Sequence, residues 1–282
     1  MIWNKIKRKA KKILGLKPKQ LWIHNQSECV MHDNCNLNNS KIILNGNSKL
    51  IVEDSVIIKN CNITLSNSIL RISNSTELSA VSFSLNENSE VHINSEVIIS
   101  EYDFHLNNSK LKIGTNCQFV KGKNALRPSI RLSNGILECN TNNLIKADFW
   151  VRFGGICKIG SYNCINEESE LRCDENIKIG DFNMISYQCD IWDTNTHCQY
   201  NKDKRRAITV KDFPYIGDEF ERPITKPIKI GNDTWIGKRA QILKGSIVSD
   251  EAIVATSAVV TNLNVLSNSI AIGNPAIIKL KK

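Results

Sequence analysis

One histidine stands where a side chain could take part in catalysis. The segment Ile191-Trp-Asp-Thr-Asn-Thr-His197 ends in the only one of the five histidines that falls in the regular C-terminal half of the chain. His197 follows the aliphatic Ile191 by six residues and opens a long polar segment, so a place in a core is not expected. A neutral imidazole with a pKa near ~6.5 can take a proton at neutral pH. His197 is therefore a candidate general base, and the alternative is an ordinary surface histidine.

The polar segment after this histidine, loop 198–227, is long for a connection inside a tightly repeating fold. Loops of this length are more often functional than incidental, although a plain solvated loop remains the alternative. Its basic and aromatic residues are suited to hydrogen bonds with hydroxyls and to stacking on sugar rings. With the tryptophan just before the loop, the candidates for substrate binding are Trp192, Arg205, Arg206 and Tyr215.

The sequence on either side of that loop follows a six-residue repeat. Aliphatic residues recur at Ile230, Ile236, Ile242, Val248, Val254 and Val260, and the fifth position of each six is Thr234, Ala240, Ser246, Ala252 and Ala258. A helix would spread these aliphatics around its axis, and a simple strand would alternate for a few residues and then turn. The repeat instead predicts an all-β parallel β-helix, in which three short strands form one triangular coil.

Upstream, a four-residue motif with the character of a strand, called the phrase below, recurs at intervals of about one coil. Its versions are Lys49-Leu-Ile-Val52, Ile69-Leu-Arg-Ile72, Glu90-Val-His-Ile93, Lys110-Leu-Lys-Ile113, Ile136-Leu-Glu-Cys139, Ile156-Cys-Lys-Ile159, Asn176-Ile-Lys-Ile179 and Pro227-Ile-Lys-Ile230. Asn-Ser pairs precede the first four and are expected at corners, where asparagine tolerates left-handed backbone angles. We therefore expect one solenoid, with irregular coils over 20–155 and hexapeptide-repeat coils over 156–279.

The net charge of +9 is concentrated at the N-terminus. Residues 1–19 hold eight lysines and arginines and no acid, which leaves 29 basic and 28 acidic residues in the rest of the chain. This asymmetry argues against a nucleic-acid partner. Apolar residues fall at helical spacing among the lysines, so 1–19 is predicted to be a basic amphipathic helix, either lying on an anionic membrane or packed on protein. No secretory signal or membrane span is expected.

Ten cysteines without a secretion signal indicate a reducing cytoplasm. If residues 1–19 bind a membrane, the inner face of the plasma membrane is then the expected place of contact. Cys29, His32 and Cys35 have gaps that could suit a metal, but one such cluster without a second pair is a weak signal. No metal is expected. Cysteines among the repeats, such as Cys157 and Cys173, are interpreted as small apolar core or corner residues.

A family resemblance rests on the order of several motifs. Ile228-Lys-Ile-Gly-Asn-Asp-Thr-Trp-Ile-Gly237 is followed by Ile242-Leu-Lys-Gly245, Ala258-Val-Val-Thr261 and Gly273-Asn-Pro-Ala276. Over about residues 156–279 the chain resembles the hexapeptide-repeat acyltransferases of the galactoside and xenobiotic acetyltransferase type, including surface-polysaccharide O-acetyltransferases. The resemblance implies a left-handed β-helix, a homotrimer with active sites between subunits, and acetyl-CoA lying along the coils.

The resemblance also implies roles for single residues. In the family a histidine in the setting Ile-x-Asp-x-Asp-x-His removes the proton from an acceptor hydroxyl, so His197 and Asp193 match, while Asn195 stands where a second Asp is common. Because Asn262 stands where the family often has a lysine, Lys279 becomes a candidate for the CoA phosphates. The residues implied to bind acetyl-CoA are Trp235, Gly237, Lys238, the backbone of Ala255 and Thr256, Thr261, and Lys279.

Three functions stay open on this basis. The first is an acetyl-CoA-dependent O-acetyltransferase acting on a cell-surface polysaccharide, capsule or lipopolysaccharide, or on its precursor, by direct transfer. An N-acetyltransferase acting on an amino sugar would use the same base, and a non-catalytic solenoid scaffold would need none. A zinc carbonic anhydrase on the same coil is discounted, because it needs several histidine ligands close together.

Overall fold

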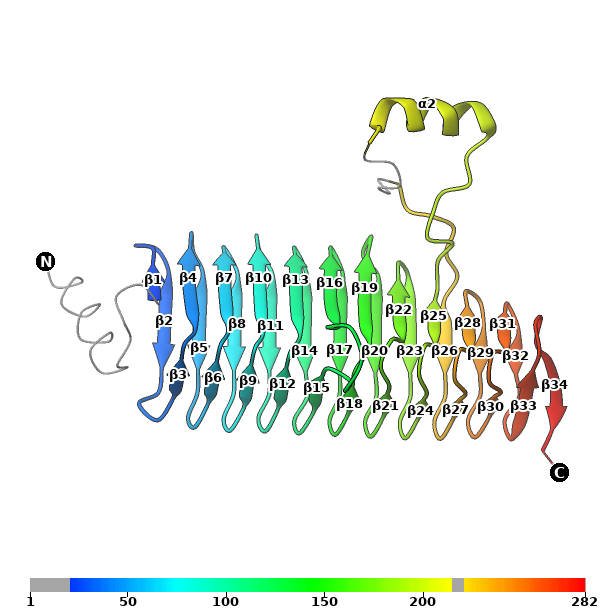
Figure 1. Cartoon of the computed structure of the whole chain (residues 1–282), viewed down its shortest axis with the longest axis horizontal. Coiled ribbons are helices and arrows are strands. Elements are labelled where there is room, and N and C mark those ends of the chain that lie inside the picture. The colour runs from blue at the N-terminus through cyan, green and yellow to red at the C-terminus, as the bar shows by residue number, and fades with distance from the viewer. Residues whose placement is uncertain (1–20, 215–220, 282) are drawn as a thin grey trace, which may run out of the picture.

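The structure of the protein is a computed structural model that describes residues 21–214 and 221–281. It is a solenoid of stacked three-sided coils, with each strand lying beside its equivalents in neighbouring coils (Figure 1). The all-β parallel β-helix expected from the repeat is confirmed, in the left-handed form that the family resemblance implied. The predicted basic helix of residues 1–19 lies outside the described residues.

Three sheets form the three faces. Sheet A has 11 strands, which are β1 (Leu21–Ile23), β4 (Lys41–Asn45), β7 (Asn62–Ser66), β10 (Ser82–Asn86), β13 (Asp103–Asn107), β16 (Ser129–Ser133), β19 (Asp148–Arg152), β22 (Glu170–Cys173), β25 (Asp190–Trp192), β28 (Gln241–Leu243) and β31 (Val259–Thr261). Sheet B has 11 strands, which are β2 (Glu28–Met31), β5 (Lys49–Val52), β8 (Ile69–Ile72), β11 (Glu90–Ile93), β14 (Lys110–Ile113), β17 (Ile136–Cys139), β20 (Ile156–Ile159), β23 (Asn176–Ile179), β26 (Ile228–Ile230), β29 (Ile247–Val248) and β32 (Asn264–Val265).

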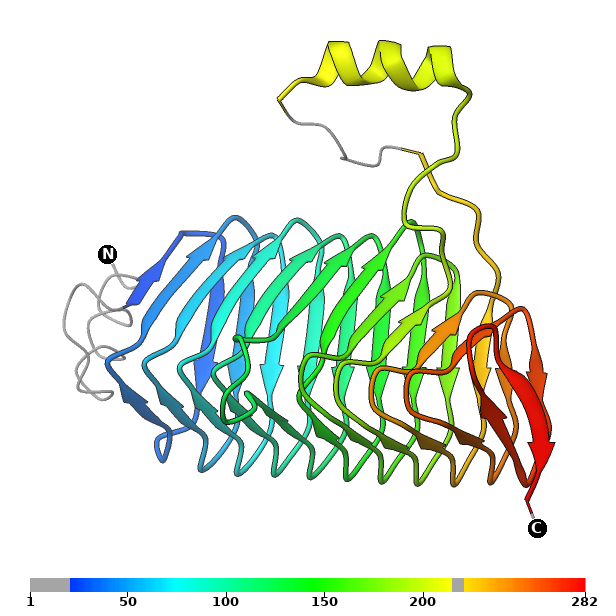
Figure 2. The ribbon, with the colours of Figure 1, turned by 45° about the vertical axis from the view of Figure 1, so that its right-hand side comes forward.

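Sheet C closes the triangle and ends the solenoid. Its 12 strands are β3 (Asn36–Asn38), β6 (Ile57–Lys59), β9 (Glu77–Ser79), β12 (Ile98–Ser100), β15 (Gln118–Val120), β18 (Leu144–Ile145), β21 (Cys164–Ile165), β24 (Met184–Ile185), β27 (Trp235–Ile236), β30 (Ile253–Val254), β33 (Ser269–Ile272) and β34 (Ile277–Leu280). All pairings are parallel among the described strands except the last, in which β34 turns back antiparallel on β33. This last strand covers the parallel edge at the C-terminal end (Figure 2).

The predicted phrases are the strands of sheet B. Seven of the eight coincide with a strand from end to end, and the eighth, Pro227–Ile230, loses only its proline. The six aliphatic positions of the hexapeptide repeat are all at most 1% exposed, and the five small positions are at most 2% exposed. Alternation along each strand explains this arrangement, because successive side chains point to opposite faces and one face of every strand lines the interior.

The Asn-Ser pairs occupy the corners between sheets A and B. Asn67, Asn88 and Asn108 have φ of 51°, 61° and 48°, which is the left-handed region expected at a tight corner. The serine that follows points inward: Ser68 Oγ accepts the backbone N–H of Ser89 at 3.2 Å. Each coil therefore caps a polar backbone group of the next at the edge of an otherwise apolar core.

Cysteines in the repeats are core residues. Cys157 and Cys173 are fully buried, and all ten cysteines are unpaired thiols. Burial raises the pKa of the Cys157 thiol, so it stays neutral in the folded protein. Within the described ranges no group of three or more metal-ligating side chains occurs, and no helix there is long and apolar enough to cross a membrane.

A long excursion leaves the solenoid between β25 and β26. It carries the helix α2 (Lys202–Asp212), which begins at Asn201, whose side chain accepts the N–H of Lys204 at 2.9 Å. No residue of α2 is buried. Figures 1 and 2 both show this helix held away from the coils at the end of a narrow connection.

Candidate active site

The excursion begins as a two-stranded neck that fixes where His197 lies. Thr194 pairs with Thr225 in an antiparallel bridge, and the N–H of Asn195 donates to the carbonyl of Ile224 at 3.0 Å. Thr196 has φ of 70°, and the N–H of His197 donates back to the carbonyl of Asn195 at 2.8 Å. His197 is thus exposed directly above a fixed neck at the corner between sheets A and B.

Asp193 lies at the base of the neck and points into the solenoid. It follows the inward Ile191 and the outward Trp192, and it is 0% exposed. Its two carboxylate oxygens accept the backbone N–H groups of three successive residues in the coil below, at 2.8, 2.9 and 2.7 Å, from Asp174, Glu175 and Asn176. Burial raises the pKa of the Asp193 carboxyl, while the three N–H donors act in the opposite sense.

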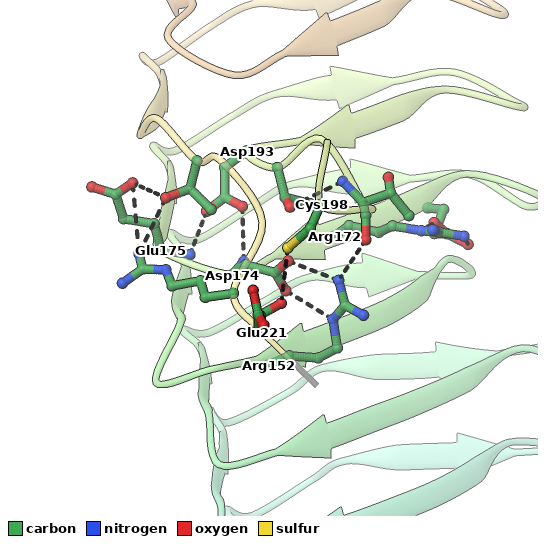
Figure 3. Close-up of polar contacts among 12 residues, drawn as sticks. Arg152, Arg172, Asp174, Glu175, Asp193, Cys198 and Glu221 are labelled. Atoms are coloured by element: carbon green, nitrogen blue, oxygen red, sulfur yellow. Dashed lines mark hydrogen bonds and ion pairs between the residues drawn. The ribbon is translucent and has the colours of Figure 1, made fainter. Parts of the chain in front are cut away.

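A buried ion pair joins the neck to the N-terminal side of the site. Arg152, at the end of β19, donates to Asp174 through Nε at 3.0 Å and Nη2 at 2.8 Å, and Asp174 is 0% exposed. The same Nη2 reaches the carbonyl of Thr196 at 3.5 Å. Figure 3 shows this chain of contacts running from Arg152 through Asp174 towards Asp193. The residue that precedes His197 is therefore tied to a charge network inside the solenoid.

A second set of contacts holds the returning strand of the neck. The hydroxyl of Thr225 donates to Glu175 at 2.6 Å, and Arg222 lies 3.7 Å from the same carboxylate. Farther out, the thiol of Cys198 donates to the carbonyl of Glu221 at 3.4 Å (Figure 3). Both strands of the neck are anchored to the coils, whereas α2 contacts the returning segment through the ion pair of Lys204 with Glu221 at 3.3 Å.

Trp192 continues a column of side chains on the outer face of sheet A. Its ring lies 4.5 Å from the guanidinium of Arg172, which in turn lies 4.8 Å from the ring of Trp150. The indole N–H of Trp192 is buried and has no hydrogen-bond partner in the part of the chain that the structure describes. An aromatic side chain whose N–H is buried thus lies one strand position before Asp193.

The remaining predicted substrate residues lie apart from this surface. Arg205 and Arg206 are exposed on α2, away from the coils. Tyr215 lies outside the described residues. Trp192 and Asp193 are consecutive at the end of β25, and His197 follows Asp193 by four residues on the neck.

Most of the predicted donor-binding residues gather at a different edge of the prism. Trp235, in β27, is 57% exposed, and Lys238 is exposed at the corner that leads from sheet C to sheet A. Gly237 is buried there, and a Cβ on it would lie 2.6 Å from the backbone nitrogen of Thr256 in the next coil, so close coil stacking already requires this glycine. The N–H of Ala255 donates to Ala271 at 2.9 Å.

Two predicted residues lie elsewhere. Thr261 ends β31 and belongs to the same outward column as Trp192, two strands farther along. Lys279 is exposed on β34 and pairs with Ile270. In a single chain the candidate base and the Trp235 corner are therefore separated by the width of sheet A.

Sequence reasoning did not single out Arg152 and Asp174. Arg152 directly follows Val151, and Asp174 directly follows Cys173. Val151 and Cys173 pair with each other in successive coils of sheet A. Opposite charges at equivalent corner positions of neighbouring coils were the available signal. It carries weight only once the coil register is known, because it is the register that makes the two residues neighbours.

Comparisons with known proteins give one sequence relative and several similar solved structures. No profile of a known protein family matches the sequence. A probable acetyltransferase of Mycobacterium tuberculosis is 29% identical over 125 residues, which are 42% of this chain and 40% of that protein. The chain thus spans well under half the length of this curated relative.

Similar solved structures are hexapeptide-repeat and polysialic acid acetyltransferases. The polysialic-acid-specific acetyltransferase NeuO is 21% identical, with a TM-score of 0.49 over 74% of this chain and 85% of that one. A hexapeptide-repeat acetyltransferase of Vibrio cholerae, solved with acetyl-CoA, is 23% identical, with a TM-score of 0.39 over 53% of this chain and 72% of that one. The sequence relative and the two solved structures named here are acetyltransferases by their descriptions.

Proposed function

We propose that the protein is an acyltransferase, and specifically an acetyl-CoA-dependent O-acetyltransferase that modifies a hydroxyl of a cell-surface polysaccharide or its precursor. The observation that carries the proposal is the exposed imidazole of His197, on a neck that leaves the solenoid just after Trp192 and that an antiparallel bridge and a bond from Arg152 hold in position. The similarity to a probable acetyltransferase supports the reaction class.

In the proposed reaction the imidazole of His197 takes the proton of an acceptor hydroxyl as its oxygen attacks the thioester carbonyl carbon. The carbon–sulfur bond then breaks, and the departing thiolate of CoA receives the proton from the imidazolium, which restores the neutral base. A backbone N–H would stabilise the negative charge on the carbonyl oxygen. Holding both substrates in one place supplies much of the remaining acceleration.

Asp193 is a positioning residue in this proposal. Its carboxylate secures the coil on which the neck stands by accepting three backbone N–H groups. The tie from Arg152 to the carbonyl of Thr196 holds the backbone directly before the base. Together these contacts keep the imidazole within reach of a substrate at the corner.

The donor fits the opposite corner, and a trimer would join the two. An exposed indole at Trp235 and a cation at Lys238 suit an extended thioester arm with phosphates at its far end. Because His197 lies across sheet A from them, a second subunit would complete the site. Met184, which is 65% exposed, pairs with Trp235 in sheet C, and Tyr162 and Phe182, which are 55% and 54% exposed, lie at the corner between sheets B and C. Exposed apolar side chains of this kind are a surface that subunits bury.

The first test is His197→Ala. Loss of a general base lowers the rate by about 10²–10⁴-fold, so release of CoA from acetyl-CoA in the presence of the host's surface glycan should fall by that factor. The matched control is His92→Ala on sheet B, a histidine that contacts Glu90, which should keep full activity. Equal rates for the wild type and His197→Ala would remove the base from the mechanism.

Two further readouts separate the alternatives. Acetyl-CoA should raise the melting temperature of the wild type and of His197→Ala alike, because a ligand of the folded state stabilises it by mass action. A scaffold would show no such shift. An O-acetyl product loses its acetyl group in mild base, whereas the amide made by an N-acetyltransferase keeps it.

A further inference from the structure

The outer face of sheet A carries a continuous polar and aromatic column that leads to the candidate base. Its members pair one after another in register: His105, Arg131, Trp150, Arg172 and Trp192. The column crosses four strand spacings, which is about 19 Å at about 4.8 Å per spacing. It ends one residue before Asp193, at the base of the neck that holds His197.

The part of the face farthest from the neck is hollowed. A depression of about 240 Å³ lies there, lined among others by Ser84, Asn107, Arg131, Ser133 and Trp150. Exposed amide, hydroxyl and guanidinium groups surround the edge of one indole. This set of groups suits sugar rings, which offer hydroxyls at their edges and an apolar face for stacking.

The charge of the hollow favours an acidic ligand. Arg131 and His105 are exposed, and neither has a hydrogen-bond or ion-pair partner among residues 21–214 and 221–281. The acidic groups of sheet A stand in the adjacent outward column, and each has a partner there: Asp103 with Arg127, Asp148 with Ser129, Glu170 with Arg172, and Asp190 with Gln241. No carboxylate is among the residues that line the hollow, and Arg131 is the lining side chain with a fixed charge, so the charge that faces the hollow is positive.

We propose that this face of sheet A, from His105 to Trp192, binds a run of several sugar units of a carboxylate-bearing glycan and directs that chain to His197. Arg131 pairs with a carboxylate of the glycan, and the edges of the Trp150 and Trp192 indoles contact its rings. The faces of these indoles already carry arginine side chains, Arg152 and Arg172 over Trp150 and Arg172 over Trp192. This inference rests on the proposed function for its direction, because the base marks the end at which a hydroxyl would be acylated. It makes the acceptor a polymer and not a single sugar.

The test is equilibrium binding to the full-length protein without acetyl-CoA, so it does not depend on whether His197 is catalytic. The probes are hexamers and dimers of galacturonic acid and of sialic acid, with neutral maltohexaose for comparison. The wild type should bind at least one acidic hexamer at least about tenfold more tightly than its dimer and than maltohexaose. Arg131→Gln should weaken hexamer binding about tenfold, the size expected for one hydrogen bond to a charged group.

The control is Arg71→Gln, an exposed arginine on β8 in sheet B, which makes the same change in net charge on another face. It should bind the hexamer as the wild type does. Equal weakening by both variants, equal binding of maltohexaose, or no binding of either acidic hexamer overturns the inference. A change in oligomeric mass on Arg131→Gln also overturns it, because the face would then be a contact between subunits.

Discussion

The two halves of the solenoid share the three-sided coil but differ in coil width and in the side chains that fill the interior. In the N-terminal half the strands of sheet A from β4 to β19 each have five residues, and the interior holds large aromatic side chains such as Phe83 and Phe104, whose rings stack at 4.5 Å. In the C-terminal half β25, β28 and β31 have three residues each, and small residues such as Ala240 and Ala258 are buried. The coils become narrower along the chain.

The change in width coincides with the candidate site. Sheet A shortens from β19 to β25, and the chain leaves for the excursion where β25 ends. Arg152, Asp174 and Asp193 occupy the corner positions at this step. These corners hold hydrogen-bonded charged side chains in place of aliphatic ones. Large side chains therefore fill the wide half, whose buried polar bonds are made by neutral serines, whereas the start of the narrow half also buries charged side chains that are bonded to one another or to backbone N–H groups.

The largest effect should come from emptying the wide interior. Phe104→Ala removes a fully buried ring that stacks on Phe83, and such cavities cost about 3–5 kcal/mol. Urea unfolding followed by circular dichroism measures the loss. Val260→Ala, in the narrow half, removes a smaller buried side chain and should cost less. If Val260→Ala costs as much as Phe104→Ala, the two interiors do not differ in the way described.

A smaller but still large effect is expected at the step between the halves. Asp193→Ala leaves one buried and two half-buried N–H groups without their acceptor, which should cost about 3 kcal/mol of unfolding free energy. Asp190→Asn, at a half-buried carboxylate that accepts from the Gln241 side chain, is the matched control and should cost little. An Asp193→Ala protein with unchanged stability but lost acetyl transfer would place the carboxylate in the chemistry instead.

The smallest expected effect is a dependence of the unfolding free energy on pH, caused by a buried thiol. Burial raises the pKa of Cys157, so above about pH 9 the thiol loses its proton in the unfolded chain but keeps it in the folded protein. The folded state then binds more protons, and the unfolding free energy falls as the pH rises. Between pH 8 and 10 this share is about 1 kcal/mol, since one pKa unit corresponds to about 1.4 kcal/mol.

Comparing the pH dependence of the unfolding free energy in the wild type and in Cys157→Ala measures this share. The variant should lose less stability than the wild type over that pH range. Val260→Ala creates a cavity of similar kind without a titrating group, so its pH dependence should parallel that of the wild type. A parallel curve for Cys157→Ala as well would mean that this thiol contributes no pH dependence.

Much of the fold could be predicted from the sequence, because the repeat acts locally. Each aliphatic residue of the hexapeptide marks one inward position of one strand, and Ile230, Ile242 and Val254 were all buried as predicted. The phrases of sheet B were recognisable for the same reason. The Asn-Ser corners followed from the backbone angles that asparagine tolerates, as Asn67 and Asn108 show.

The candidate site could be predicted only in part. The place of His197 at the mouth of a loop was readable, but the inward direction of Asp193 was not, since a carboxylate in an interior position contradicts the usual pattern until its three N–H donors are seen. The pairing of Arg152 with Asp174 spans one whole coil, and the column on sheet A joins residues from five coils.

The sequence by itself determined the coil, its corners and which residues face inward, because those features depend on spacing within about twenty residues. Only the tertiary structure decided that the excursion stands on a neck tied to a buried ion pair, and that Trp235 lies on a different edge from His197. Stacking decides such neighbours: residues one coil apart touch only when the register of every coil between them is set. The register is a property of the whole solenoid and not of any one repeat.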